Sequence, residues 1–291
     1  MLAFRRGFGG SCRGVADFKV EKWSSLKRMK MKSSALHLAM SPCPNDTFMF
    51  DAMVNGRIDT EGLEFEVEYL DIEQLNGAAL EQRYDVTKCS TAILPAICES
   101  YKLLDSGSAL GRGNGPLLVR RKGFEGAVRS IVVPGLHTTA NLLTHRLFPE
   151  IESRTPMLFS EIADMVAGGE YDAGVLIHEG RFVYERYNLE LVADLGLEWE
   201  RRTSLPLPLG SIVARRALDA EVIATVERVL RRSIEYAFAH PMASRDYVKQ
   251  HAQELDDRVI DSHISLFVND YSLSLGDEGR RAVERLTELK L

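Results

Sequence analysis

His178 is the side chain of this sequence whose type and position best suit proton transfer. It directly follows the apolar run of residues 174–177, which predicts a strand, so the imidazole should project from the carboxyl end of that strand. A neutral imidazole with a pKa near the operating pH can act as a general base. A packing role is the alternative, since a lone histidine is more often structural. A zinc site of the His-Glu-x-x-His type would need a histidine where the sequence has Phe182.

Three segments join a predicted strand to a predicted helix and carry small hydroxyl or amide side chains: PND (residues 44–46), KCST (88–91) and HTTA (137–140). Helix N-termini at such junctions offer unpaired N–H groups and a partial positive charge, which suit an anionic or small polar ligand. Plain N-capping explains any one of them, but three in one chain favour a ligand site. The first junction makes Asn45 and Asp46 candidate ligand contacts.

The remaining signals for nucleotide or metal chemistry are incomplete. Residues 111–115 (GRGNG) begin like a dinucleotide-binding fingerprint, but Pro116 and a strand follow where a helix should begin. We therefore interpret this segment as a flexible connection near the ligand-binding cleft that we expect between two lobes of the chain (below). The other histidines lie in a predicted strand or on or at the ends of predicted helices, and we interpret them as core or surface residues: His37, His145, His240, His251 and His263. We predict no metal site and no cofactor.

The composition is that of an ordinary soluble globular protein, with 291 residues, 45% hydrophobic and 27% charged. The net charge of -6 is uneven, because residues 1–32 hold nine basic and two acidic side chains and the rest is acidic. An acidic body argues against nucleic-acid binding. The basic residues 1–35 lack the apolar stretch of a signal peptide, and no run reaches the roughly 18 apolar residues that span a membrane. Four cysteines in no C-x-x-C spacing favour a reduced, cytoplasmic setting. Glycines among residues 1–35 argue against a regular element, so we expect a disordered N-terminal extension.

From residue 35 onward, strand-length apolar runs alternate with segments of helical period, which predicts an α/β fold with a largely parallel sheet. Lobe 1 is expected to comprise residues 36–120 and 205–291, and lobe 2 residues 121–204, with a central cleft between them. The first boundary is placed at 120–123. The predicted strands are 35–40, 63–69 (at or near a sheet edge), 85–89, 116–119, 130–133, 157–159, 173–177, 191–195 and 211–214. The predicted helices are 47–55, capped by Asn45 or Asp46, then 72–84, 92–101, 138–148, 161–167 and most of 219–291.

Five separated motifs together resemble one family, the 1,4-dihydroxy-6-naphthoate synthases of the futalosine route to menaquinone. They are SPCPNDTF (41–48), GSALGRG (107–113), PGLHTTA (134–140), VLIHE (175–179) and LPLPLG (205–210). The likeness covers residues 36 to the end. It implies a two-lobed fold like that of type II periplasmic binding proteins. It also implies a carbon–carbon lyase that converts cyclic dehypoxanthine futalosine to 1,4-dihydroxy-6-naphthoate without a redox cofactor or metal.

The resemblance also assigns roles to residues. Its catalytic base corresponds to His178. Its substrate contacts correspond to Lys88, Cys89 and Ser90 in one segment and to Thr138 and Thr139 in another. The substrate carboxylate would suit either the helix N-terminus at the two threonines or Ser90 with Lys88 nearby.

Two other classes stay open from the sequence. A non-catalytic small-molecule-binding protein would use the same cleft without turnover, and a search for product by mass spectrometry would distinguish it. Chorismate dehydratase of the same pathway shares the fold, and incubation with chorismate would reveal it. A transcription-factor effector domain would need a helix-turn-helix, which the glycine-bearing residues 1–35 cannot supply.

Overall fold

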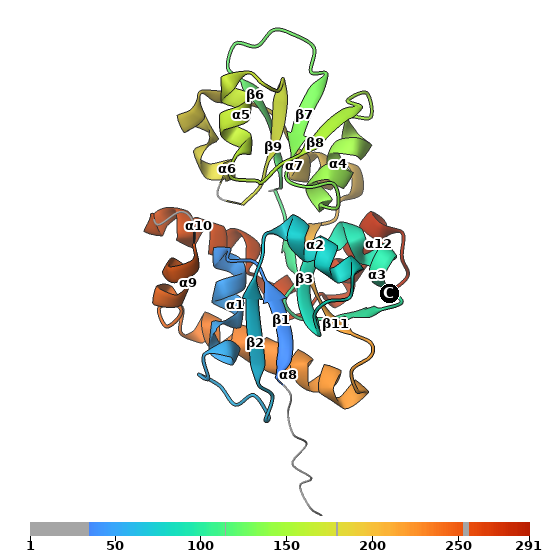
Figure 1. Cartoon of the computed structure of the whole chain (residues 1–291), viewed down its shortest axis with the longest axis vertical. Coiled ribbons are helices and arrows are strands. Elements are labelled where there is room, and N and C mark those ends of the chain that lie inside the picture. Colours follow the sequence, from blue (N-terminus) through green and yellow to red (C-terminus); the bar gives the residue numbers. More distant parts are fainter. Residues whose placement is uncertain (1–34, 114, 179, 253–255) are drawn as a thin grey trace, which may run out of the picture. The chain divides into compact units, whose positions relative to one another are not determined.

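The computed structural model describes residues 35–113, 115–178, 180–252 and 256–291 (Figure 1). By its internal contacts the chain divides into residues 1–33 and residues 34–291, and the fold described below is that of the second unit. The extension predicted for residues 1–35 lies, except for Ala35, outside the described residues. Among the residues described, no helix has both the length and the apolar character needed to cross a membrane.

The first sheet is mixed, with the strand order β2-β1-β3-β11-β4 and with β5 also paired to β11. β1 is parallel to β2 and β3, whereas β11 runs antiparallel to β3, β4 and β5. β2 lies at an edge, as predicted. The strands are β1 (Leu36–Met40), β2 (Phe65–Tyr69), β3 (Val86–Ser90), β4 (Tyr101–Leu103), β5 (Ala109–Gly111) and β11 (Leu207–Arg215).

Helices cover both faces of the first sheet. Successive side chains of β1 point to opposite faces, and apolar residues occur on both of them. Leu38 and Met40 pack against α1 and α8, whereas Ala39 packs against α2. The helices of this half are α1 (Pro44–Val54), α2 (Ile72–Leu80), α3 (Leu94–Ile97), α8 (Ala220–Ala239), α9 (Arg245–His251), α10 (Asp257–Phe267), α11 (Asp270–Leu273) and α12 (Gly276–Thr287), with the 3-10 turn η1 (Thr91–Ile93).

The second sheet has the order β10-β6-β9-β7-β8 and is also mixed. β7 is parallel to β8 and β9, and β6 is antiparallel to β9 and β10. α4 and α7 pack on one face, and α5 packs on the other. The elements are β6 (Leu117–Arg121), β7 (Ser130–Val133), β8 (Ser153–Pro156), β9 (Ala173–Leu176), β10 (Leu189–Asp194), α4 (Thr139–Leu147), α5 (Ile162–Gly168), α6 (Gly180–Val183), η2 (Tyr184–Tyr187) and α7 (Leu195–Thr203).

The structure corrects the predicted first boundary and the predicted sheet type. Residues 117–121 form β6 of the second sheet, so the chain passes between the sheets after β5 and not at 120–123. β11 carries the chain back and begins at Leu207, close to the expected return at 205. Both sheets are mixed because these connecting segments add antiparallel strands to a parallel set of three.

Several predicted elements differ in extent. α1 begins at Pro44 with Cys43 as its N-cap, where we expected Asn45 or Asp46 to cap a helix from residue 47. Proline suits the first helical position because it has no N–H to leave unpaired. The helix predicted at 92–101 is instead η1, α3 and β4, and the strand predicted at 157–159 lies at 153–156. Gly111, the first residue of the connection predicted at 111–115, belongs to β5 and pairs with Leu207 of β11.

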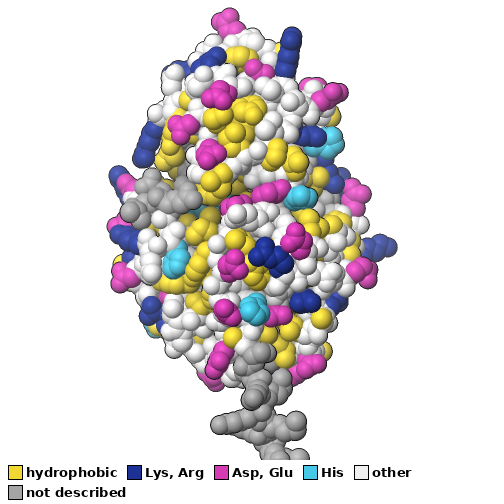
Figure 2. Space-filling model, in the orientation of Figure 1, with side chains coloured by type: hydrophobic (Ala, Val, Ile, Leu, Met, Phe, Trp, Pro, Cys, Tyr) yellow, Lys and Arg dark blue, Asp and Glu magenta, His cyan; other side chains and the backbone are white. Residues whose placement is uncertain are grey.

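Charges of both signs are mixed on one face of the molecule (Figure 2). On the face drawn in Figure 2, basic and acidic side chains lie interspersed, and no extended basic region forms there. That face offers no phosphate-neutralising patch of the kind that binds nucleic acid.

Candidate active site

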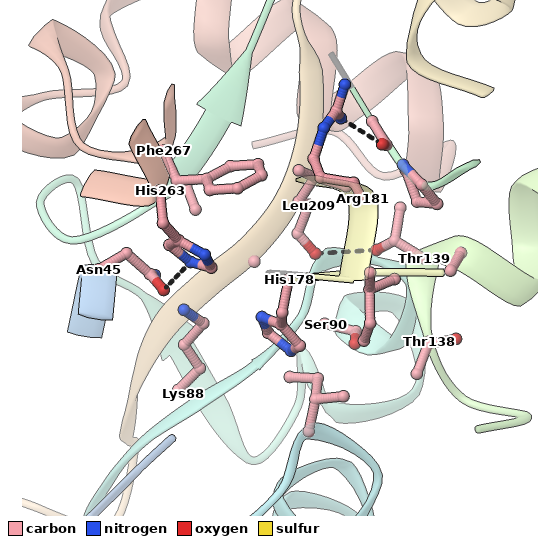
Figure 3. Close-up of a pocket in the computed structure, with 17 residues that line it drawn as sticks. Asn45, Lys88, Ser90, Thr138, Thr139, His178, Arg181, Leu209, His263 and Phe267 are labelled. Atoms are coloured by element: carbon pink, nitrogen blue, oxygen red, sulfur yellow. Dashed lines mark hydrogen bonds between the residues drawn. The ribbon is translucent and has the colours of Figure 1, made fainter. Parts of the chain in front are cut away.

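A pocket of about 630 Å³, its open mouth included, is lined by elements of both sheets. Figure 3 shows Lys88 of β3, His178 of the turn after β9 and His263 of α10 turned toward the same space. Six of the eight residues predicted to form the site line this pocket: Asn45, Lys88, Ser90, Thr138, Thr139 and His178.

His178 lies just beyond the end of β9 and adopts a left-handed backbone with φ +51°. That conformation is uncommon for a residue with a side chain, although histidine tolerates it better than most, and such strain often marks functional sites. The ring packs edge-on against Phe159 at 4.9 Å between centroids. Its Nδ1 lies 3.3 Å from the Cys43 Sγ. The imidazole is therefore held from two sides at the pocket wall.

The charge state of His178 differs from our expectation. Burial, followed by the positive charge of Lys88, lowers its pKa to about 4, while Asp46 acts in the opposite direction. We expected a pKa near the operating pH. The ring is instead neutral throughout the neutral range, so it can accept a proton, but it is a weaker base than an unperturbed imidazole.

Lys88 forms an ion pair with Asp46, and both side chains are almost completely buried. The Asp46 carboxylate also accepts hydrogen bonds from Ser41 Oγ at 2.6 Å and from Asn45 Nδ2 at 2.8 Å. A Cβ at Gly210 would lie 2.8 Å from Lys88 Cε, so a glycine there leaves room for the lysine. Asp46 itself does not line the pocket, and its role is to hold Lys88.

Cys89 was predicted as a substrate contact, but the structure places its side chain away from the pocket. Neighbours in a strand point to opposite faces, so Lys88 and Ser90 face the pocket while Cys89 enters the core with Ile93 and Val213. Burial raises the pKa of the Cys89 thiol to about 12, with Lys88 opposing. The alternation of side chains along β3 would have revealed this difference.

Ser90 is positioned by Asn76, a residue that the sequence analysis missed. The Ser90 N–H donates to Asn76 Oδ1 at 2.7 Å, and Asn76 Nδ2 donates to Ser90 Oγ at 3.0 Å. Because the hydroxyl oxygen already accepts from Asn76, its proton is left to donate toward the pocket.

Thr138 and Thr139 lie at the pocket, but their hydroxyl groups are engaged by the backbone. Thr138 Oγ1 caps α4 by accepting from the Asn141 N–H and donates to Gly135 O. Thr139 Oγ1 donates to Leu209 O and accepts from the Ala92 N–H. What this helix end offers a ligand is the N–H groups of its first turn, which have no acceptor within the helix. The start of α4 lies at the pocket and offers backbone donors in place of side-chain hydroxyls, and its contact with substrate stays a prediction.

Two ionisable residues that line the pocket were not predicted, His263 and Arg181. His263 of α10 is buried, and its Nε2 lies 3.1 Å from Asn45 Oδ1. Its ring is nearly parallel to that of His178, at 6.0 Å between centroids. Arg181 donates to Gly115 O and pairs with Asp194 at 3.3 Å, which places a compensated positive charge beside the pocket. We had interpreted His263 as structural and had assigned Arg181 no specific geometry.

The comparisons with known proteins decide between the possible families. A family model described as "Menaquinone biosynthesis" matches residues 36–290. A 1,4-dihydroxy-6-naphthoate synthase of Thermus thermophilus is 48% identical over 255 residues, 87% of this chain and 92% of that protein. One of Streptomyces coelicolor is 42% identical over 263 residues, 88% of this chain and 93% of that protein. The chain belongs to the 1,4-dihydroxy-6-naphthoate synthase family of menaquinone biosynthesis. It is accordingly an enzyme of the lyase class.

Solved structures confirm the fold predicted for a member of this synthase family. A protein of Archaeoglobus fulgidus superposes with a TM-score of 0.82 at 35% identity, covering 87% of this chain and 95% of that one. The ligand-binding component of a Staphylococcus aureus ABC-type import system gives 0.66 at 12% identity, covering 87% and 90%. A Candida albicans protein described as having the generic periplasmic binding protein fold gives 0.64 at 11% identity, covering 88% and 90%. At these low identities the last two show the fold alone.

The donor set of this synthase does not resemble a metal site. Within the four described ranges, no group of three or more His, Cys, Asp or Glu side chains has the geometry to hold a metal ion. The pocket instead combines neutral imidazoles, a compensated ion pair, a hydroxyl donor and a helix N-terminus. Such a set suits proton transfer on an anionic organic molecule.

Proposed function

We propose that this synthase acts on cyclic dehypoxanthine futalosine and releases 1,4-dihydroxy-6-naphthoate, with His178 as the general base. The observation that carries the proposal is a neutral imidazole held on the wall of a pocket in a chain of this family. Removal of a substrate proton by His178 would start the eliminations that aromatise the ring and expel the sugar-derived fragment. Aromatisation makes the overall reaction favourable.

The contact with Cys43 bears on which nitrogen acts. If Nε2 is to accept the proton, Nδ1 must keep its own. The Cys43 Sγ lies closer to Nδ1, at 3.3 Å, than to Nε2, at 3.8 Å, and would accept from the Nδ1 N–H. Cys43 would then help to hold the ring in the tautomer that has a lone pair on Nε2.

The product carries a carboxylate, and we propose that it binds between Ser90 and the N-terminus of α4. Ser90 would donate its hydroxyl proton, and the first-turn N–H groups of Thr139 and Ala140 would donate from the helix. The Ala92 N–H donates to Thr139 Oγ1, which places the segment after Ser90 beside the start of α4. Lys88 is less suited to this role, because Asp46 already compensates its charge.

The apolar lining suits the ring system of such a ligand. Ile72, Ile177, Leu209 and Phe267 line the same pocket. These side chains can enclose a fused aromatic ring while the polar groups fix its orientation. Exclusion of water by this enclosure would strengthen the polar contacts.

The cytoplasmic location expected from the cysteine pattern is also a proposal.

The test is turnover by the purified full-length chain. With cyclic dehypoxanthine futalosine, mass spectrometry should detect 1,4-dihydroxy-6-naphthoate in amounts far above the enzyme concentration. With chorismate, the substrate should not be consumed. Binding without product would favour a non-catalytic binding protein, and consumption of chorismate would favour chorismate dehydratase. Either result would overturn the proposed function.

A further inference from the structure

His263 is linked to the buried ion pair by hydrogen bonds whose direction can be worked out. An ion-paired carboxylate can only accept, so Asn45 must present its Nδ2 to Asp46, and the two atoms lie 2.8 Å apart. The amide oxygen of Asn45 then faces His263 Nε2 at 3.1 Å. Because an oxygen accepts, Nε2 must carry the proton. In a neutral ring, Nδ1 of His263 is therefore a lone-pair acceptor.

That acceptor has no partner in the part of the chain that the structure describes. His263 Nδ1 is buried and makes no hydrogen bond with any of the described residues, although the side chain is only 1% exposed. Burial, followed by the neighbouring His178 and Lys88, holds the pKa of His263 well below its usual value, so the ring stays neutral. Buried acceptors are nearly always satisfied, which makes this atom an exception that needs an explanation.

The surroundings of His263 indicate which group could donate a hydrogen bond to Nδ1. The ring lines the pocket beside His178 and packs against Phe267 at 4.9 Å between centroids. Figure 3 shows the labelled ring at the wall of the pocket, with Asn45 behind it. A donor that belongs to the ligand would satisfy the atom.

We propose that His263 is a second substrate-contacting residue, whose Nδ1 accepts a hydrogen bond from a hydroxyl group on the ring of the bound ligand. The inference rests on the proposed function for the identity of the ligand, which as 1,4-dihydroxy-6-naphthoate has two ring hydroxyls. His178 and His263 then have different tasks, since the first moves a proton and the second orients the ring.

Two substitutions separate this role from a structural one. The amide of His263→Asn falls near the position of Nδ1, and that of His263→Gln falls near the position of Nε2. Asparagine thus keeps an acceptor for the ligand and loses the contact with Asn45, whereas glutamine does the reverse. His240→Gln, at an exposed helix end, is the matched control.

The measurement is the affinity for two ligands that share one carboxylate position, 1,4-dihydroxy-6-naphthoate and 2-naphthoate, which lacks the hydroxyls. Wild type and the His240→Gln control should prefer the dihydroxy compound. That preference should fall roughly 3- to 10-fold in His263→Gln, the usual worth of one hydrogen bond, and should persist in His263→Asn. Thermal unfolding of each variant shows that it is folded.

The outcomes distinguish a contact between His263 and the ligand from a purely structural role of His263. A preference lost in His263→Asn and kept in His263→Gln would assign His263 only to supporting Asn45 and would overturn the inference. An unchanged preference in both variants would overturn it as well. If wild type neither binds the dihydroxy compound nor forms it, the proposed function fails too, and the inference falls with it.

Discussion

Replacing Lys88 with methionine tests the buried ion pair most sharply. Methionine approximates the length of lysine without its charge, so Asp46 would stay buried with only Ser41 and Asn45 as donors. Removal of one partner of a buried pair costs about 3–5 kcal/mol, because a charge is left uncompensated. At about 2–4 °C per kcal/mol for a domain of roughly this size, the unfolding temperature should fall by about 6–20 °C.

The double variant Lys88→Met/Asp46→Asn is the control for that loss. It removes both charges and keeps the shape of the pair, so most of the stability should return. Urea unfolding of wild type and both variants gives the free energies directly. A loss below about 1 kcal/mol in the single variant, or a double variant no more stable than the single one, would refute the reasoning about desolvation.

Three other predictions concern activity. The pKa of His178 is lowered to about 4, and the neutral ring is the active form. We therefore expect kcat/KM to be constant with respect to this group from neutral pH down to about pH 5, and to fall as the pH drops through the value near 4. A fall in kcat/KM centred near pH 6.5 would contradict this. Ser90→Ala should raise KM by about 10- to 100-fold, which corresponds to the free energy of a hydrogen bond to a carboxylate, and should change kcat much less. An unchanged KM would place the carboxylate elsewhere. Deletion of residues 1–30 should leave kcat/KM unchanged in steady-state assays, and a large loss would assign that segment a part in the enzyme.

The position of His178 was predictable from the sequence because its determinants are local. An apolar run of strand length ends directly before it, and the three helix junctions follow similar runs. The same period-two rule separates Lys88 and Ser90 from Cys89, and it would have corrected that assignment had it been applied there.

His263 shows why other parts of the site were not predictable. Its partner Asn45 is 218 positions away along the chain, so no local pattern relates the two. The mixed character of the first sheet has the same origin, since β11 pairs with strands more than 90 residues earlier. The three-residue strand β5 forms only through that pairing. Long-range contacts of this kind are set by the tertiary fold and not by propensity.

The role of His178 as the base is tested by single-turnover and steady-state conversion of cyclic dehypoxanthine futalosine by wild type and His178→Ala. We expect the variant to fold and to bind 1,4-dihydroxy-6-naphthoate nearly as well as wild type, but with kcat lower by at least about 100-fold. A kcat close to that of wild type in His178→Ala would show that another group removes the proton.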